Sequence, residues 1–291
     1  MAEARNIPHD ATISSGELAR ILFQPGIKIV DASFFPPNLS RSASAEYESL
    51  HIPGAVFFDI DGIADSDSPL PHMLPNPADF AHKVGELGIG SGDTVVVYDS
   101  QGIFSAPRVW WMFRVMGHDK VLVLDGGLPK WLAERQPVTN KPTIIKPAAF
   151  SATLRPELVR SADDVASGQS LVIDARSPGR FSGEDLEIWP GRRAGHIPGS
   201  CNVFFGSLID SGRKTLLPPD ALREKFAGVD LSRPLTVSCG SGVTACVLAL
   251  ALYQLGYPDV AVYDGSWAEW GLPASNRPVE VGALSSGDSA L

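Results

Sequence analysis

The chain has 291 residues, 44% hydrophobic and 20% charged, and 24 Lys and Arg against 33 Asp and Glu give a formal net charge of −9. This length fits two domains with full apolar cores, and the composition is globular, neither disordered nor collagen-like. The acidic balance, without a dense basic run, argues against a surface that tracks phosphates, so we expect no nucleic-acid partner.

The longest apolar run, residues 243–252, is far shorter than the roughly 20 residues that a membrane helix needs, so we expect no membrane partner. The N-terminal residues lack the apolar core of a secretion signal and the Arg-rich character of a transit segment, which predicts a cytoplasmic location. The three cysteines, Cys201, Cys239 and Cys246, form neither a C-x-x-C pair nor a zinc spacing. We therefore expect free thiols and no metal site.

Short apolar runs alternate with helical patterns along the chain. Helices are predicted over residues 77–87, 106–116, 219–226 and 244–255, and strands over 94–98, 121–124, 171–173, 235–237 and 260–263. Continuous apolar runs are typical of parallel strands that are buried on both faces. The alternation predicts an α/β fold with parallel sheets flanked by helices on both faces. Ligands of such sheets bind beyond the carboxyl ends of the strands.

The chain contains an internal repeat. The string His-Ile-Pro-Gly occurs at residues 51–54 and again at 196–199, an offset of 145, and other matched pairs have offsets of 139 to 143. Two matched modules of about 120 residues predict a duplicated domain. We assign residues 1–139 to an N-terminal domain, 140–156 to a polar, proline-punctuated linker, 157–279 to a C-terminal domain and 280–291 to a disordered tail.

Residues that both halves share are better explained by the fold than by a single active site. His51 and His196 occupy the same turn of the two halves and are therefore predicted to be structural. The positions that differ are more informative. At an offset of 140, Asp99 lies opposite Cys239, each at the end of a strand and the start of a helix.

Cys239 opens the loop Cys-Gly-Ser-Gly-Val-Thr, residues 239–244, which runs directly into a predicted helix. Its two glycines allow a tight turn whose backbone N–H groups point inward, which stabilises an anion at the centre. A cysteine there should have a lowered pKa and present a nucleophilic thiolate. The loop residues expected to contact substrate are Gly240, Gly242, Val243 and Thr244.

A cysteine in such a loop suggests two chemistries. Cysteine phosphatases need an arginine in a C-x5-R arrangement to bind phosphate through two hydrogen bonds, and here that position is Ala245. Without the guanidinium, the loop can still hold a negatively charged persulfide. Sulfur transfer is therefore the preferred chemistry, and a cysteine phosphatase stays open as a second reading of the loop.

The double module resembles the tandem-domain rhodanese superfamily over about residues 33–278. The resemblance rests on the strings at residues 51–61, 71–75, 105–114, 124–128 and 239–244. Members that use thiosulfate usually carry basic residues after the cysteine, where this chain has Gly240 and Ser241. A doubly charged thiosulfate would favour those missing cations, so the chain is most similar to the branch that uses 3-mercaptopyruvate.

The resemblance assigns roles to individual residues. Cys239 is similar to the nucleophile that becomes a persulfide, and Ser241 to a residue that polarises the substrate or relays a proton. His72 and Asp61 match a first-domain pair that reaches the cleft and works with that serine. Neither belongs to the shared fold, because Asp61 falls opposite a glycine of the second half and His72 opposite a threonine.

The substrate arginines follow the family pattern only in part. Arg180 resembles the arginine that binds the carboxylate or keto oxygen of the substrate, a role that suits its planar fork. Arg176 is expected to be a structural ion-pair partner. A second substrate arginine is usual nine residues after the first, and here that position holds Trp189. Arg192 and Arg193 are the nearest cations that could take its place.

The resemblance thus implies a sulfurtransferase that moves sulfur from a small-molecule donor, 3-mercaptopyruvate, through a Cys239 persulfide to a thiophilic acceptor, with release of pyruvate. Cyanide would serve as acceptor in an assay, and thioredoxin or a small thiol in the cell. No cofactor is implied, and the two half-reactions predict ping-pong kinetics. The same residues would also suit a thiosulfate-preferring sulfurtransferase, or a module that only carries persulfide or binds a partner.

Overall fold

The computed structural model describes residues 10–282, and the part up to residue 133 contains one complete α/β unit. Its strands are β1 (Thr12–Ile13), β2 (Ile27–Asp31), β3 (Ala55–Phe57), β4 (Thr94–Tyr98) and β5 (Val121–Leu124). Its helices are α1 (Ser15–Ile21), α2 (Ala43–Ser49), α3 (Ile60–Ile63), α4 (Pro77–Glu86), α5 (Ala106–Val115) and α6 (Gly127–Ala133). Proline at the first helical position and an asparagine cap, Asn76, explain where α4 begins.

The second unit repeats this arrangement. Its strands are β6 (Val159–Arg160), β7 (Leu171–Asp174), β8 (Cys201–Asn202), β9 (Leu235–Ser238) and β10 (Ala261–Tyr263). Its helices are α7 (Ala162–Ala166), α8 (Pro178–Ser182), α9 (Pro219–Lys225), α10 (Ala245–Gln254) and α11 (Ser266–Trp270), with short 3-10 turns at Pro156–Leu158, Phe205–Leu208 and Pro273–Ser275. The helices and strands predicted from sequence in both units are confirmed to within one residue at each end.

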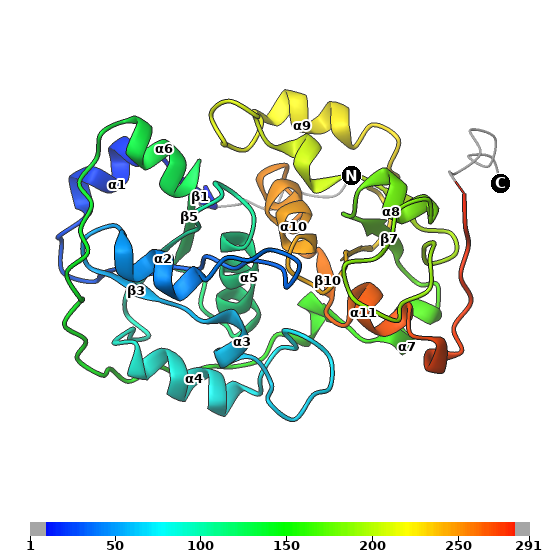
Figure 1. Cartoon of the computed structure of the whole chain (residues 1–291), viewed down its shortest axis with the longest axis horizontal. Helices are drawn as coiled ribbons and strands as arrows, with labels where there is room; N and C mark the ends of the chain where they lie inside the picture. The colour runs from blue at the N-terminus through cyan, green and yellow to red at the C-terminus, as the bar shows by residue number, and fades with distance from the viewer. Residues whose placement is uncertain (1–9, 283–291) are drawn as a thin grey trace.

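Both units are built on a five-stranded parallel sheet. The strand orders are β1-β5-β4-β2-β3 and β6-β10-β9-β7-β8, which is the same order in both halves. Every pairing between named strands is parallel. The predicted fold class, two tandem α/β domains each built on a parallel sheet flanked by helices, is therefore confirmed (Figure 1).

Strand β4 shows why its apolar run is continuous. Val95 and Val97 pack into one apolar cluster, whereas Val96 and Tyr98 pack into another. Successive residues of a strand point to opposite faces, so a strand with helices on both faces needs apolar side chains at every position. The central strands of both sheets are buried for this reason.

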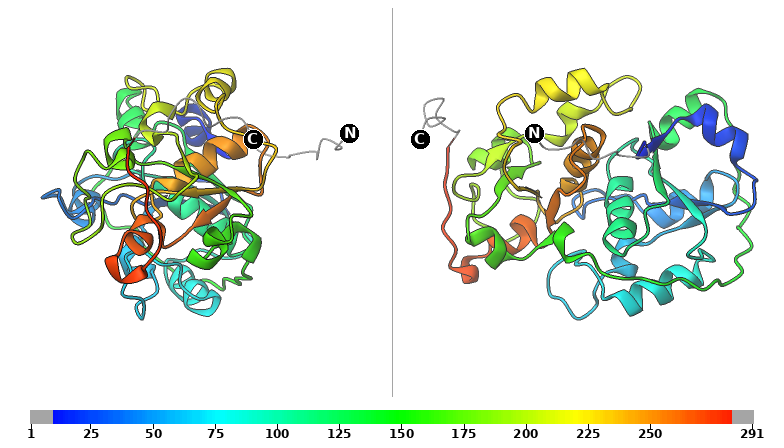
Figure 2. Two further views of the ribbon diagram at one scale, coloured as in Figure 1. Left: turned by 90° about the vertical axis from the view of Figure 1, so that its right-hand side faces the viewer. Right: turned by 180° about the vertical axis from the view of Figure 1, so that it is seen from behind.

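Helices α5 and α10 pack against each other between the two units. They stand side by side in the middle of the molecule in the front and rear views (Figure 1, Figure 2). Every residue of α5 and most of α10 are buried, as expected for predominantly apolar helices at the centre of a molecule, although α5 also buries Arg108 and Arg114. One apolar cluster therefore runs from the first sheet through both helices into the second unit.

The connecting segment 134–155 contains no helix or strand and follows the surface of the first unit. Its backbone is tied to that unit at Ala148, whose N–H donates to the Gly85 carbonyl, and at Thr153, whose N–H donates to the Met116 carbonyl. At the other end, Glu280 pairs with His196 in an antiparallel bridge, so residue 280 does not belong to the predicted disordered tail. The rest of that tail, 283–291, lies outside the described residues.

The residues that the two halves share have equivalent structural roles. His51 and His196 each pair with a distant chain segment, Thr139 and Glu280 respectively, and both rings are buried. The indole N–H groups of Trp131 and Trp270 donate to proline carbonyls at equivalent distances of 2.8 Å. None of the helices within residues 10–282 has the length and apolar character needed to cross a membrane.

Candidate active site

The Cys239 loop follows β9 at the carboxyl end of the second sheet, where the fold class places ligands. The Cys239 N–H donates to Ser266 Oγ at 3.2 Å, and the Trp267 N–H donates to the Cys239 carbonyl at 3.0 Å. Gly242 adopts φ +80°, and a β-carbon there would lie 2.8 Å from the Asp264 carbonyl oxygen. The strand end, the start of α11 and this glycine together fix the loop.

A cavity of about 280 Å³ opens on the loop. Five of the predicted site residues line it, namely Cys239, Gly240, Ser241, Val243 and Thr244, and Arg180 lines it from the side. Cys239 is 2% exposed and Ser241 8%, so both face the cavity rather than open water. Gly242 lies in the loop but does not line the cavity, because its backbone is packed against Asp264 below.

Arg180 lies on α8 beside the loop. Its Nε and Nη2 donate to Glu187 Oε2 at 3.2 and 2.6 Å. A β-carbon on Gly240 would lie 2.8 Å from Nη2, so glycine at this position lets the guanidinium approach the loop closely. Nη1 has no hydrogen-bond partner within residues 10–282. One edge of the fork is therefore available for an anionic ligand.

Arg176 is the structural ion-pair partner that the sequence predicts. It is fully buried and binds both carboxylate oxygens of Asp174, and its Nη1 donates to Glu187 Oε1 at 2.6 Å. Its guanidinium also stacks over the Trp267 ring at 4.4 Å. Glu187 thus bridges Arg176 and Arg180, and it holds the Arg180 fork in place.

The first unit brings His72 and Asp61 to the same region. His72 Nδ1 and Asp61 Oδ1 are 2.5 Å apart, and the His72 side chain is buried while that of Asp61 is 63% exposed. Nε2 of His72 is buried and has no hydrogen-bond partner among the described residues. The ring contacts Trp189, a wall of the cavity, at a centroid distance of 5.6 Å. The structure therefore brings the predicted pair together, with His72 behind the Trp189 wall, but neither residue lines the Cys239 cavity, and Asp61 lines a separate pocket.

The structure contains a buried ion pair beneath the loop that the sequence did not predict. Arg108, on α5 of the first unit, donates to Asp264 Oδ1 at 2.6 Å and to the Gly242 carbonyl at 3.4 Å. Its other terminal nitrogen donates to the His72 carbonyl. His72 has φ 59°, a left-handed conformation that is costly for this residue type and needs support from its surroundings. Arg108 therefore connects the His72 backbone to the nucleophile loop across the domain interface.

The internal repeat does mark Arg108 as a position where the two halves differ. It lies within an apolar helix, and at offsets of 139 and 140 it falls opposite Val247 and Leu248 of the second half. A charge in one half opposite an apolar residue in the other is the same kind of asymmetry that singles out Cys239. Only the packing of α5 on α10 shows what the charge contacts.

The two candidates for a second substrate cation do not reach the cavity. Arg193 donates to the backbone carbonyls of Trp270 and Arg277 and to Ser275 Oγ, and Arg192 donates to the Ala268 and Pro190 carbonyls. Neither lines the cavity, whereas Trp189 does. Their guanidinium groups hold the segments after α8 and α11 together, so the proposal that either replaces the missing arginine finds no support in the geometry.

The other two thiols lie in poorer positions for chemistry. Burial raises the pKa of Cys201 to about 11. Burial also raises the pKa of Cys246, which is completely enclosed in α10. Thiols with raised pKa values are largely protonated near neutral pH and are weak nucleophiles. Within residues 10–282, no three His, Cys, Asp or Glu side chains gather in a group that could hold a metal ion.

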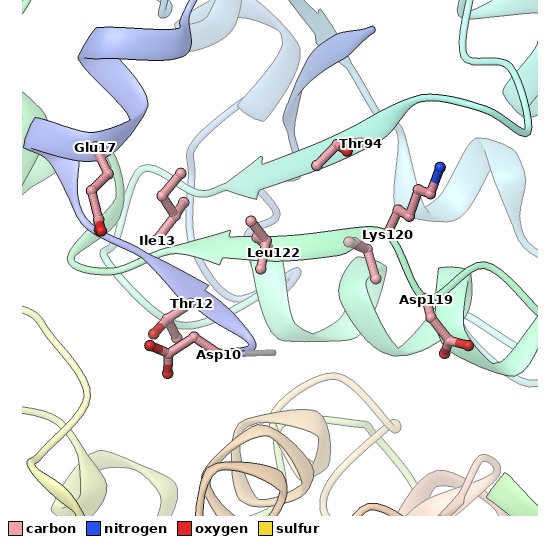
Figure 3. A pocket seen from close by; sticks show the side chains of 9 residues that line it. Asp10, Thr12, Ile13, Glu17, Thr94, Asp119, Lys120 and Leu122 are labelled. Carbon is pink, nitrogen blue, oxygen red and sulfur yellow. The ribbon is translucent and has the colours of Figure 1, made fainter. Parts of the chain in front are cut away.

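A larger cavity of about 570 Å³ lies elsewhere, at the amino ends of β4 and β5 (Figure 3). Thr94 and Lys120 lie along its rim, and Asp10 and Thr12 close it from the edge strand. Asp119, on the same rim, is held by Arg155 in two hydrogen bonds of 2.6 Å. This cavity lies at the end of the sheet opposite to the loops that carry chemistry in such folds.

Two segments of the chain, residues 14–134 and 159–272, match the family model described as "Rhodanese-like domain". They cover the two parallel sheets and their helices except for the edge strand β1, which precedes the first segment. The chain belongs to the rhodanese family. The resemblance noted in the sequence is thereby confirmed, and Cys239 occupies the loop at the carboxyl end of the central strand of the second rhodanese domain.

Curated rhodanese relatives cover most of the chain. "Thiosulfate/3-mercaptopyruvate sulfurtransferase 2" of Arabidopsis thaliana is 47% identical over 286 residues, which covers 89% of this chain and 83% of the relative. "3-mercaptopyruvate sulfurtransferase" of Homo sapiens is 45% identical over 263 residues, 88% of each chain. The crystal structure of SseA from Escherichia coli, described as a 3-mercaptopyruvate sulfotransferase, is 40% identical with a TM-score of 0.80, covering 89% of this chain and 99% of that one.

Proposed function

We propose that this protein is a 3-mercaptopyruvate sulfurtransferase. The observation that carries the proposal is the cavity in which the Cys239 thiol faces the guanidinium fork of Arg180. A nucleophile and an anion-binding group on one small cavity suit a donor that carries both a sulfur atom and a carboxylate. Three relatives named 3-mercaptopyruvate sulfurtransferase, each 44–45% identical to this chain, support this choice.

In the first half-reaction, the Cys239 thiolate attacks the sulfur of 3-mercaptopyruvate. An S–S bond forms, the C–S bond breaks, and its electron pair passes to carbon as the enolate of pyruvate. The proton that was on the sulfur of the donor passes to the enolate and gives pyruvate, and the persulfide stays on Cys239 as an anion that the loop amides would stabilise. Nη1 of Arg180, the free edge of the fork, binds the substrate carboxylate.

We assign proton transfer to Ser241 and to the pair of His72 and Asp61. Asp61 accepts from His72 Nδ1, which leaves Nε2 as the ring position that can accept or return a proton. Nε2 is buried without a partner among the described residues, so it has unused hydrogen-bonding capacity. Ser241 lines the Cys239 cavity and lies two residues after the nucleophile in the same loop.

In the second half-reaction a thiol accepts the sulfur, which regenerates the Cys239 thiolate. We propose thioredoxin or a small cellular thiol as the acceptor, and a cytoplasmic location, where thiols are kept reduced. Thiosulfate is the second candidate donor, because relatives named thiosulfate sulfurtransferase are 46–47% identical to this chain. The charges at the site favour 3-mercaptopyruvate over thiosulfate. The carboxylates of Asp174 and Glu187 balance the charges of Arg176 and Arg180 beside the loop. The site therefore has no net positive charge to attract the doubly negative thiosulfate.

The decisive experiment is the intact mass of the protein after incubation with 3-mercaptopyruvate and, separately, with thiosulfate, while pyruvate is measured. We expect one added sulfur on Cys239, one pyruvate per protein with the first donor, and faster loading by that donor. Cys239→Ser is the control and should gain nothing, whereas Cys201→Ser should load normally. Faster loading by thiosulfate would reverse the donor assignment, and no loading by either donor would leave a carrier or binding module.

A further inference from the structure

The walls of the Cys239 cavity are aromatic on both sides of the domain interface. Phe34 and Phe104 come from the first domain, and Trp189, Phe204 and Phe205 from the second. All five are half-buried, so each keeps a face or an edge open. Rings from opposite domains meet at the cavity, since the centroids of Phe104 and Phe205 are 5.7 Å apart.

The cavity is larger than the proposed donor requires. Its volume is about 280 Å³, close to the roughly 300 Å³ at which cavities for drug-sized ligands begin. A donor with seven non-hydrogen atoms leaves part of this space empty. Outside the Cys239 loop and the segment from Arg176 to Arg180, all the residues that line the cavity are apolar, and five of them are aromatic.

The charge balance of the site also favours an apolar second ligand over an anionic one. Arg176 and Arg180 are neutralised by Asp174 and Glu187, and Arg108 is neutralised by Asp264. Trp189 stands where a further cation would have faced the cavity, and Arg192 and Arg193 are bound elsewhere. Among the residues that line this cavity, the open edge of Arg180 is left to attract an anion. A second anionic molecule therefore gains little at this site, whereas an apolar molecule gains aromatic contacts.

We propose that the aromatic walls form an acceptor subsite that selects aromatic and other apolar thiols over anionic thiols, and that Trp189 determines this selection. The proposal rests on the proposed function, because it concerns the persulfide of Cys239. In the transfer step, the acceptor thiol gives its proton to the persulfide anion, and the resulting thiolate attacks the outer sulfur of the persulfide. An S–S bond forms to the acceptor, the S–S bond to Cys239 breaks, and its electron pair leaves on the Cys239 thiolate, so no external oxidant or reductant is needed.

Trp189 suits this role because it belongs to the cavity wall and to the domain interface together. Its ring meets His72 of the first domain edge-on at 5.6 Å, and its indole nitrogen lies near Gly240 of the nucleophile loop. An aromatic acceptor beside it would stack on the ring while its sulfur reaches Cys239. An arginine in its place would present a cation and remove the largest apolar surface of the wall.

The test uses the full-length protein with Cys239 already persulfidated, either by 3-mercaptopyruvate or by inorganic polysulfide. The persulfide is discharged with benzyl mercaptan, 2-mercaptoethanol or 3-mercaptopropionate, and the loss of one sulfur is followed by intact mass. Each rate is corrected for the thiolate fraction of its acceptor. We expect benzyl mercaptan to react on the order of tenfold faster than 3-mercaptopropionate, with 2-mercaptoethanol between them.

Two variants and one control assign the preference to Trp189. Trp189→Arg should bring the ratio of the two rates close to one, and Trp189→Phe should keep most of the preference. Leu186→Ala, in the same segment but 94% exposed, is the matched control and should leave the ratio unchanged. Equal rates for the three thiols in the unaltered protein, or an unchanged ratio in Trp189→Arg, would overturn the proposal.

The loading step separates this proposal from the function on which it rests. If 3-mercaptopyruvate does not load Cys239 but the polysulfide-loaded protein still prefers benzyl mercaptan, the donor assignment fails and the acceptor subsite stands. If 3-mercaptopyruvate loads Cys239 and the three thiols then react equally, the function stands and the subsite fails.

Discussion

The loops that follow β4 and β9 occupy the same place in the two domains and share their backbone supports. The Leu128 N–H donates to the Asp99 carbonyl at 3.0 Å, as the Trp267 N–H does to the Cys239 carbonyl. Each loop has a glycine with positive φ three residues after its first residue, +115° in the first domain and +80° in the second. The two loops differ in what occupies their centres.

In the first domain, the Asp99 carboxylate fills the loop. Its Oδ2 accepts the backbone N–H groups of Phe104, Ser105 and Ala106 at 2.8 to 3.0 Å, and its Oδ1 accepts that of Gln101. The side chain is fully buried. The four backbone N–H groups that could bind an anion, here called the cradle, are therefore permanently occupied by the Asp99 carboxylate. In the second domain the equivalent position holds the Cys239 thiol, which lines the cavity. The comparison teaches that the duplicated fold places the same loop at the same strand end in both domains, whereas the side chain at its centre differs.

Replacing the residues at the centres of the two loops, Cys239 and Asp99, should have the largest effect on the rate of sulfur transfer. Cys239→Ser should lower the rate of sulfur transfer by at least about a thousandfold, because the nucleophile is lost. Adding Asp99→Cys to that variant should not restore transfer, since position 99 is fully buried and lacks the Arg180 fork and Ser241. Pyruvate release under single-turnover conditions measures both. Recovery of transfer in the double variant would mean that the cradle alone makes the site.

The ion pair beneath the reactive loop has no counterpart among the described residues of the first domain, and its removal should come next. Arg108→Met leaves Asp264 charged and buried without its partner, which should cost about 3–5 kcal/mol in the free energy of unfolding. Asp264→Asn in addition should recover part of this loss, but not the rate of persulfide formation, because the His72 carbonyl remains unsupported. Urea unfolding and single-turnover kinetics separate the two effects.

Arg114 on the same helix provides the matched control for Arg108. Its guanidinium stacks over Tyr253 at 4.3 Å, away from the nucleophile loop. Arg114→Met should lower stability while the rate of persulfide formation in the folded protein stays unchanged. An equal loss of rate in both variants would show that Arg108 acts only on stability.

Emptying the cradle of the first domain should affect stability without affecting chemistry. Asp99→Ala leaves four backbone N–H groups without their carboxylate acceptor, which should cost about 2–4 kcal/mol in the free energy of unfolding. Asp99→Asn keeps one acceptor oxygen and should lose less. Donor turnover per folded molecule should be unchanged in both, and a large fall in turnover would contradict the division of roles between the two loops.

The smallest effect concerns Asp125 and Asp264, which occupy matching positions. Each accepts a backbone N–H from the other domain, from Leu216 at 2.9 Å and from Leu74 at 2.7 Å, but of the two only Asp264 forms an ion pair with an arginine within residues 10–282. Burial raises the pKa of Asp125 in the folded protein. The stability it contributes is therefore fully present below its unfolded pKa of about 3.9 and is lost as pH rises through the folded pKa.

Asp125→Asn should consequently make the protein slightly more stable at pH 7, and this gain should vanish as the pH falls toward 3. Melting temperatures of the variant and the unaltered protein over this pH range provide the measurement. Asp264→Asn at pH 7 is the contrasting variant and should destabilise, because Arg108 loses its partner. A loss of stability for Asp125→Asn at pH 7 would contradict the raised pKa.

Much of the site can be predicted from sequence because the chain contains its own comparison. Cys239 and Asp99 stand out as unlike residues at matching positions, and His72 and Asp61 lack counterparts in the second half. Trp189 in the place of an arginine is visible in the same way. Arg192 and Arg193 are the nearest cations along the chain, but the structure binds both to backbone carbonyls instead. Distance in sequence says nothing about the direction in which a long side chain points.

The sequence by itself determined the duplicated α/β fold and the position of the thiol in a loop at the carboxyl end of a strand. These depend on local properties: continuous apolar runs form buried strands, and glycines after a strand form a tight turn. Only the tertiary structure decided that Arg108 supports His72 and Gly242, and that rings from both domains enclose the cavity. Those features arise at the interface where α5 packs on α10, and contacts between residues far apart in the chain are fixed by packing rather than by local pattern.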